Sequence, residues 1–334
     1  VSGTAKATYN IESGANTGKG LGITNELNFT ASGETDAGYT WSYSMELDPG
    51  ATQVSGDTDT EGSQSAQNDD TQLTLTTPYG TVGVFISEGG LDVEDAASQS
   101  AYARPTDMGG SDGVVDNFTI DAYNNMQYHT PADLIPFGGS FKIAYAPDLD
   151  TYGSGNNSGV TVAEGNTTTV GRSATEMQVS FDSIPMADGL KIGASYFQFD
   201  KQGDEGKKDQ EAESGAYYAT YAIGNVSLGY SKAYKALLVG DDANTGVEYY
   251  DQTNQSIAYA VNDDLTISYE VEKSEANYVL DTTAAIEQKS TGVQLAYNMG
   301  GMTLAIARNS HDNPSYSTTA ADLDQTLIAV TMAF

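Results

Sequence analysis

Residues 327–334 read Leu-Ile-Ala-Val-Thr-Met-Ala-Phe, and a large apolar side chain stands at every second position. Ile328, Val330, Met332 and Phe334 form the apolar set, while smaller or polar residues lie between them. Successive side chains of a β-strand point to opposite faces of the sheet. The alternation therefore predicts a strand with one apolar and one polar face.

The same period of two recurs along the whole chain. We count sixteen segments of this kind, an even number, with lengths of roughly ten residues that suit a tilted membrane-crossing strand. Clear examples are the sets Tyr39/Trp41/Tyr43/Met45/Leu47, Leu190/Ile192/Ala194/Tyr196, Leu265/Ile267/Tyr269/Val271 and Met302/Leu304/Ile306. The pattern predicts an all-β fold, a transmembrane antiparallel β-barrel of sixteen strands that occupies residues 1–334 as one domain.

The connections between these segments alternate in length. Short connections such as 77–80 and 300–301 are rich in Gly, Pro, Asn and Asp, which suit tight turns. Long connections such as 49–70, 88–124 and 147–172 fall between them. A barrel with long loops at one end and short turns at the other has this layout.

Composition excludes several classes of protein. There are 46 Asp+Glu against 14 Lys+Arg, so the net charge is −32, which argues against a nucleic-acid partner. Without Cys there is no disulfide, thiolate zinc site or cysteine nucleophile. We expect His129 near the turn end of the sixth strand and His311 in the last long loop, so the two cannot share a site. We therefore expect no enzyme.

A soluble all-β protein is the alternative reading of the alternation. The mean hydropathy of −0.38 would suit it, but barrel strands are apolar on one face only. Strand count, loop alternation and the apolar last strand favour the barrel. The chain opens with residues 1–4, Val-Ser-Gly-Thr, and shows no signal peptide. We expect either a cytoplasmic protein or, as the barrel requires, a mature outer-membrane chain whose signal has been removed.

Several short motifs resemble the general diffusion porins of Gram-negative outer membranes, most closely the alphaproteobacterial type. They are Ser-Gly-Thr-Ala-Lys at 2–6, Leu-Asn-Phe-Thr-Ala-Ser-Gly-Glu-Thr-Asp-Ala-Gly at 27–38, Tyr-Gly-Thr-Val-Gly at 79–83 and the terminal Phe334. The resemblance implies a homotrimer in contact with outer-membrane lipid. It also implies a third long loop, about 88–124, folded inward to narrow the pore, and Phe334 as an assembly signal.

Acidic residues dominate this expected constriction loop, which contains one basic residue, Arg104. We expect its carboxylates to line the constriction: Glu88, Asp92, Glu94, Asp95, Asp107, Asp112 and Asp116. By strand parity, further acids point inward from the wall: Glu26, Glu46, Glu176 and Glu270. An acidic bore lowers the energy of cations and raises that of anions.

The candidate basic residues of the pore wall are few: Lys6, Arg104, Lys142 and Lys191. Many members of the resembled family carry basic residues at inward positions of the second strand. Here Thr24 and Glu26 stand at those positions. We therefore predict a passive channel for small hydrophilic solutes and ions, with a preference for cations.

Two other readings stay open. The inward aromatic residues Phe85, Phe197 and Tyr218 would suit a substrate-selective channel on the same fold. Alternatively, the run Asp57, Asp59, Glu61 resembles the start of a calcium loop, although Asn68 stands where that loop needs Glu. It favours an acidic, calcium-binding surface protein or a solvated acidic loop. Apart from this candidate Ca²⁺ we expect no cofactor.

Overall fold

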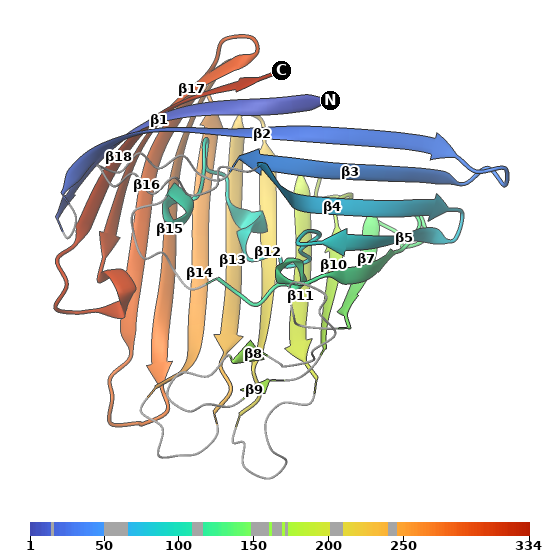
Figure 1. Cartoon of the computed structure of the whole chain (residues 1–334). Coiled ribbons are helices and arrows are strands. Elements are labelled where there is room, and N and C mark those ends of the chain that lie inside the picture. Colours follow the sequence, from blue (N-terminus) through green and yellow to red (C-terminus); the bar gives the residue numbers. More distant parts are fainter. Residues whose placement is uncertain are drawn as a thin grey trace.

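A closed ring of sixteen antiparallel strands forms the protein, and strands that follow one another along the chain also pair in space (Figure 1). The computed structural model describes residues 1–14, 17–49, 66–108, 116–147, 160–161, 169–170, 173–200, 210–239 and 246–334. The prediction of an antiparallel sixteen-stranded barrel is confirmed.

The strands of the ring are β1 (Ser2–Gly14), β2 (Gly18–Glu34), β3 (Thr40–Pro49), β4 (Ala66–Thr77), β5 (Gly80–Ile86), β6 (Asn125–His129), β7 (Gly139–Ala146), β10 (Ala174–Phe181), β11 (Leu190–Phe199), β12 (Glu213–Ile223), β13 (Val226–Ala236), β14 (Val247–Ala260), β15 (Leu265–Tyr278), β16 (Ile286–Asn298), β17 (Met302–Asp312) and β18 (Leu323–Ala333). A separate pair consists of β8 (Val160–Thr161) and β9 (Thr169–Val170). The short 3₁₀ helices are η1 (Asp95–Ala97), η2 (Pro105–Met108), η3 (Ile120–Ala122) and η4 (Pro314–Tyr316).

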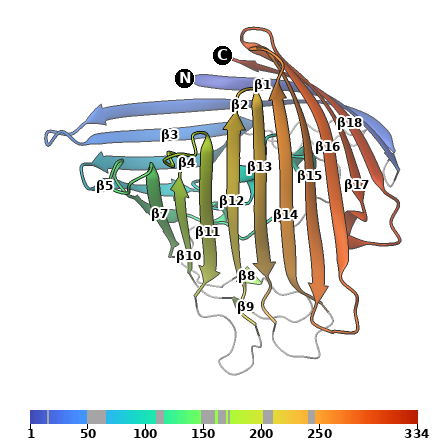
Figure 2. The ribbon, with the colours of Figure 1, turned by 180° about the vertical axis from the view of Figure 1, so that it is seen from behind.

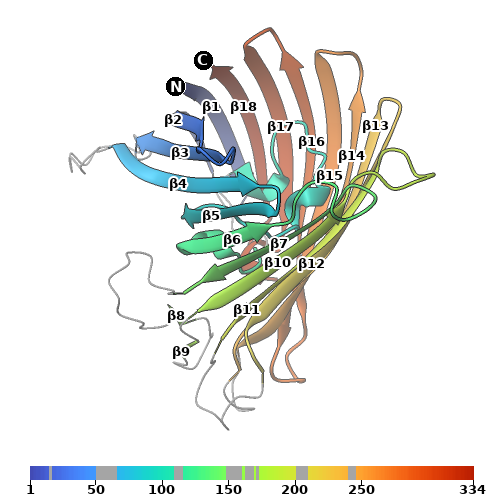
Figure 3. The same ribbon diagram turned by 90° about the vertical axis from the view of Figure 1, so that its right-hand side faces the viewer.

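The first and last strands close the ring. β1 pairs with β18 from Thr4 opposite Ala333 to Gly14 opposite Leu323. Beyond this ladder, the backbone N–H of Gly3 donates to the carbonyl of Phe334 at 2.9 Å, and that of Phe334 donates back at 3.0 Å. The two termini therefore lie side by side (Figure 3). Closure matters because it leaves no sheet edge with unpaired backbone groups.

The polarity of the two strand faces is inverted relative to a soluble protein: many large apolar side chains point outward, and many polar ones are buried inside the barrel. On β18, Leu323, Gln325, Leu327 and Ala329 are buried and point inward, where Gln325 bonds to a loop inside the barrel. Outward-facing apolar side chains elsewhere in the ring are exposed, such as Leu21, Ile23, Val84, Ile257, Val293 and Ile306. Figure 2 shows the outside of β11–β18, the wall that carries many of them. An apolar exterior is stable when lipid covers it.

The strands of the second half extend beyond their apolar segments. The alternation of apolar residues does not extend clearly into 247–254, 273–278 and 309–312, yet the structure continues β14, β15 and β17 through these segments. His311 accordingly lies in β17 and is fully buried, which corrects its assignment to a loop. These ends carry charged residues on their outward face, so the apolar alternation stops before the strand does.

The short turns follow the chemistry expected of them. Gly300 and Gly301 connect β16 to β17 with φ angles of 62° and 74°. Positive φ at both central residues matches the twist of a tight hairpin and favours Gly. Among the described residues, no helix is long and apolar enough to cross a membrane.

The outward face should not tolerate charge. Ile306→Arg on β17 should lower the free energy of unfolding in lipid vesicles by about 2–4 kcal/mol, because the guanidinium would lie in the hydrocarbon layer. Thr24→Arg, which adds the same group to the inward face of β2, is the control and should cost less than half as much. Equal costs for the two variants would contradict the assignment of faces.

Candidate functional site

One long connection folds back into the barrel. It joins β5 to β6 and is called here the inner loop, residues 87–124, of which 109–115 lie outside the described residues. Its three short helices, η1, η2 and η3, lie inside the ring of strands (Figure 1). Most of its hydrogen bonds to the wall lie along the inward face from β10 to β18, and Gln72 of β4 and Gln127 of β6 bond to its first residues.

Short polar side chains of the wall hold the backbone of the inner loop. Nearly every strand from β11 to β18 supplies one hydroxyl or amide at an inward position. Ser195 accepts from Val93 N–H at 3.2 Å, Ser231 donates to the Glu94 carbonyl at 2.7 Å, Ser256 donates to the Ala97 carbonyl at 2.7 Å, Ser268 accepts from Ala101 N–H at 2.8 Å, Gln294 accepts from Tyr102 N–H at 2.9 Å and Gln325 donates to the Met108 carbonyl at 3.1 Å. Because this loop is buried, its backbone groups need such partners.

Three inward glutamates fasten the loop at its ends and its middle. Glu176 on β10 accepts from the N–H groups of Leu91 and Ile120, at 3.2 Å and 2.9 Å, and so joins the outgoing and returning legs. Glu270 on β15 accepts from the hydroxyls of Ser98 and Ser100 at 2.7 Å and 2.5 Å. Both glutamates are fully buried, so the expectation that they line the open bore is wrong.

The third glutamate, Glu272 on β15, was missed by the sequence reasoning. Its side chain accepts from the N–H and the hydroxyl of Thr106, at 3.2 Å and 2.9 Å. Strand parity was the available signal, since Glu272 lies two positions after Glu270 and therefore on the same inward face.

Small residues leave room for the loop to approach. A Cβ on Gly229 of β13 would lie 1.7 Å from the Ala97 carbonyl oxygen, and one on Gly292 of β16 would lie 2.8 Å from Pro105. Only glycine permits the wall to approach the Ala97 backbone and the Pro105 ring so closely. The wall is thus shaped to receive η1 and η2.

An apolar cluster covers the base of the loop. Leu91, Ile120 and Tyr123 pack with Phe197 and Phe199 of β11 and with small wall residues. Phe85 and Phe197 are 5% and 1% exposed, and Tyr218 packs against Val93. Phe85 and Phe197 therefore hold the loop and form no exposed track for a solute. Tyr218 is half-buried and lines a hollow together with Lys191 and Thr220, so the alternative of a substrate-selective channel now depends on Tyr218.

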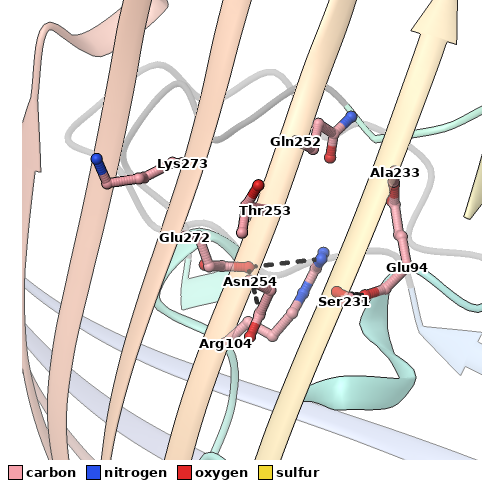
Figure 4. A pocket seen from close by; sticks show the side chains of 9 residues that line it. All are labelled: Glu94, Arg104, Ser231, Ala233, Gln252, Thr253, Asn254, Glu272 and Lys273. Carbon is pink, nitrogen blue, oxygen red and sulfur yellow. Dashed lines mark hydrogen bonds and ion pairs between the residues drawn. The ribbon is translucent and has the colours of Figure 1, made fainter. Parts of the chain in front are cut away.

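Arg104 lies in the inner loop, and its assignment to the pore wall is wrong. Its side chain is 9% exposed and is surrounded by carboxylates: a bidentate pair with Asp107 at 2.8 Å and 3.0 Å, contacts with Asp95 and with Asp116 at 3.3 Å, and an ion pair with Glu272 at 3.6 Å. Figure 4 shows the pocket between Arg104, Glu94, Glu272 and the strands β13–β15. The one cation of the loop is therefore surrounded by acids.

Carboxylates of the inner loop remain in contact with water around this arginine. The side chains of Asp95, Asp107 and Asp116 are 54%, 45% and 67% exposed. Within the loop, Asp92 accepts from the Ser195 hydroxyl at 2.8 Å, and Glu94 is buried. Glu88 accepts from Gln72 at 3.4 Å, and its pKa is raised by burial and by the charge of Glu46.

The opposite part of the wall is also acidic. In the ring order, β2 and β3 lie half-way round from β12 and β13, on which η1 is seated. The register places Glu26 beside Thr4 and Glu46 opposite Asn28, on the inward face of these strands. Thr4 donates to Glu26 at 3.1 Å. The basic cluster that the resembled family places here is missing.

Three lysines share the inward face with these acids. Lys6 pairs with Thr24 and Thr331, Lys142 with Gln178, and Lys191 with Thr220. Among the described residues, none of the three is in an ion pair. Lys6 is thus the basic residue nearest to Glu26 across the β1–β2 ladder.

Burial changes the acidity of the loop carboxyls. Burial, followed by the charges of Asp92, Asp95 and Asp116, raises the pKa of Glu94 to about 9. Partial loss of solvation inside the barrel raises the pKa of Asp95 to about 7, an effect that Arg104 opposes and Asp107 and Asp116 reinforce. Both shifts favour the neutral carboxyl, and they do so more strongly for Glu94 than for Asp95, which is paired with Arg104.

Some expected residues cannot be placed. Asp112 and the candidate calcium residues Asp57, Asp59 and Glu61 lie outside the described residues. In the parts of the chain that the structure describes, no group of three His, Asp or Glu side chains could hold a metal ion. The backbone of Phe334 meets Gly3 at the closing seam, as given above, and its side chain is exposed.

Comparison with known proteins supports one family. The model of the Gram-negative porin family matches residues 1–331. No curated protein matches the sequence. Three solved structures illustrate the likeness in fold, each aligned over 100% of this chain. The first is an anion-selective porin from Comamonas acidovorans, with a TM-score of 0.70, 14% identity and 98% of that chain covered. The second is OmpF of Salmonella typhi in complex with daunomycin, with a TM-score of 0.66, 13% identity and 96% of that chain covered. The third is a variant of the Rh. blastica porin, with a TM-score of 0.60, 14% identity and 99% of that chain covered. At these identities the likeness shows the fold.

The raised pKa of Glu94 makes loop docking sensitive to alkali. A carboxyl whose pKa is higher in the docked state stabilises docking fully below its ordinary pKa of 4.5 and loses that contribution as pH rises toward about 9. Hydrogen exchange of the amides 93–98, corrected for intrinsic rate, should show protection falling between pH 6 and pH 9. Glu94→Gln should flatten this fall, whereas Glu275→Gln on the outward face should not. An unchanged fall in Glu94→Gln would contradict the assignment.

Proposed function

This chain belongs to the Gram-negative porin family and forms a non-enzymatic outer-membrane channel, and we propose that the channel passes small hydrophilic solutes and prefers cations. The observation that carries the preference is the distribution of charge around the bore. Exposed carboxylates lie on the inner loop, half-buried Glu26 and Glu46 lie on the β2–β3 wall half-way round the ring, and Arg104 is buried among acids.

The physical argument concerns the energy of an ion inside the bore. Low-dielectric walls focus the field of nearby charges, so a bore lined by carboxylates attracts cations and repels anions. Lys6, Lys142 and Lys191 oppose this field. Lys6 lies on β1, whereas Lys142 on β7 and Lys191 on β11 have one strand, β10, between them. Without basic residues at positions 24 and 26, the transverse field between loop and wall is weak and the net negative field is strong.

Assembly as a homotrimer in contact with outer-membrane lipid is part of the proposal. It is supported by membership of a family that is typically trimeric. The outward face of β1 is consistent with it, because Ala5 and Ala7 are small and leave a flat surface. The inner loop, about 88–124, would then constrict each of three separate pores, and Phe334 would serve in assembly.

Reversal potentials in a salt gradient test the ion preference. Wild-type channels in a planar bilayer should show a potential of the sign given by cation preference, and closure in three equal steps would report the trimer. Thr24→Arg with Glu26→Arg should cut the preference severalfold or reverse it, because it restores basic groups to the wall. The matched control is Thr253→Arg with Glu275→Arg, the same change of charge on the outward face, and it should leave the potential unchanged. Anion preference in the wild type would overturn the proposal.

The preference should also depend on pH. Because the pKa of Asp95 is about 7, this carboxyl gains most of its charge between pH 6 and pH 8. Cation preference measured in the same salt gradient should therefore rise over that interval. Asp95→Asn should show a smaller rise, and a rise as large as that of the wild type would exclude Asp95 as its source.

A further inference from the structure

Arg104 connects separate parts of the inner loop to each other and to the wall. Its partner Asp95 begins η1, Asp107 lies in η2, and Asp116 lies on the returning leg. The fourth partner, Glu272, belongs to strand β15 of the barrel. One guanidinium thus joins three loop segments and one wall strand, which the planar fork of an arginine can do and a lysine ammonium cannot.

The same carboxylates would repel one another if the arginine were removed. Glu272 is 3% exposed and also holds Thr106 of η2. Asp107, in the same short helix, would then face it without a cation between them. A buried carboxylate that loses its partner is strongly disfavoured. The segment that carries η2 would therefore tend to leave β15 and move toward the bore.

The contacts on either side of this segment do not depend on Arg104. Glu270 and Gln294 hold residues 98–103, ahead of η2, and Gln325 holds Met108, the last residue of η2. On the returning leg, Ser214 donates to the Phe118 carbonyl at 3.1 Å, and Lys235 donates to the Asp116 carbonyl at 2.7 Å. Loss of Arg104 should therefore loosen one stretch of the loop and leave the barrel and the first half of the loop in place.

We propose that Arg104 is a positioning residue of this channel: it keeps the inner loop docked on β15 and so holds the pore open at a constant width. The inference rests on the channel function of the family and is independent of the proposed ion preference.

Planar-bilayer recordings and hydrogen exchange on the whole purified channel test it. Arg104→Gln is compared with Arg308→Gln, which removes the same charge from an exposed outward-facing side chain paired with Asp324 at 3.2 Å. Arg104→Gln should close at lower voltage with frequent partial closures, and the amides of Arg104, Thr106 and Asp107 should exchange roughly ten to a hundred times faster. Arg308→Gln should behave as the wild type. If Arg104→Gln gives no channels, Arg104→Lys against Arg308→Lys decides the question, with the same direction expected.

A second substitution separates positioning from general loss of stability. Arg104→Gln combined with Glu272→Gln removes the one buried charge among the four carboxylates around position 104 and so lowers their repulsion. Closing voltage and exchange should therefore return toward the wild type. Equal behaviour of Arg104→Gln and Arg308→Gln, or a double variant worse than Arg104→Gln, would overturn the inference. The salt gradient in the same recordings reports ion preference separately, so failure of the proposed function would be seen as a reversal potential and not as a change in closure.

Discussion

A sheet surrounded by lipid has no water to satisfy its edge, and the rest of this structure depends on that constraint. Every backbone group within the membrane must find its partner inside the protein, so the sheet has to close. Here the closing seam is the ladder between β1 and β18, extended by the mutual hydrogen bonds of Gly3 and Phe334. Once the ring is closed, one face of every strand meets lipid and the other meets the interior. This explains why apolar side chains are exposed and polar ones buried.

The interior of the ring is wide enough to admit a loop, and the loop creates a second requirement. A buried loop carries backbone groups that a sheet does not satisfy, so the wall must supply them. The serines, glutamines and glutamates on the inward faces of β10–β18 do this, and Gly229 and Gly292 leave the space in which η1 and η2 fit. The inward wall residues under the loop therefore serve to dock it, whereas the inward residues of β1–β3 face the bore.

This division changes the meaning of the net charge of −32. Acidic residues inside the barrel fall into two groups with different physical roles. Glu176, Glu270 and Glu272 are buried and hold the loop, and burial raises the pKa of Glu94. The exposed carboxylates of Asp95, Asp107 and Asp116 contribute to the field of the bore. Arg104 stands between the groups, because it pairs with members of both.

The sequence alone was sufficient for the strand number, the closed antiparallel ring and the inward face of each strand. These follow from a local property, the alternation of side chains along a strand, which is legible wherever one face is apolar. The prediction from sequence was wrong where the alternation ends, as at His311, because the strand ends beyond the lipid are polar on both faces. Which inward residues meet water and which meet the loop was decided only by the tertiary structure. Glu26 and Glu176 have the same parity and the same chemistry. They differ because the loop packs over one and not over the other, and that contact joins residues 56 to 85 positions apart in the chain.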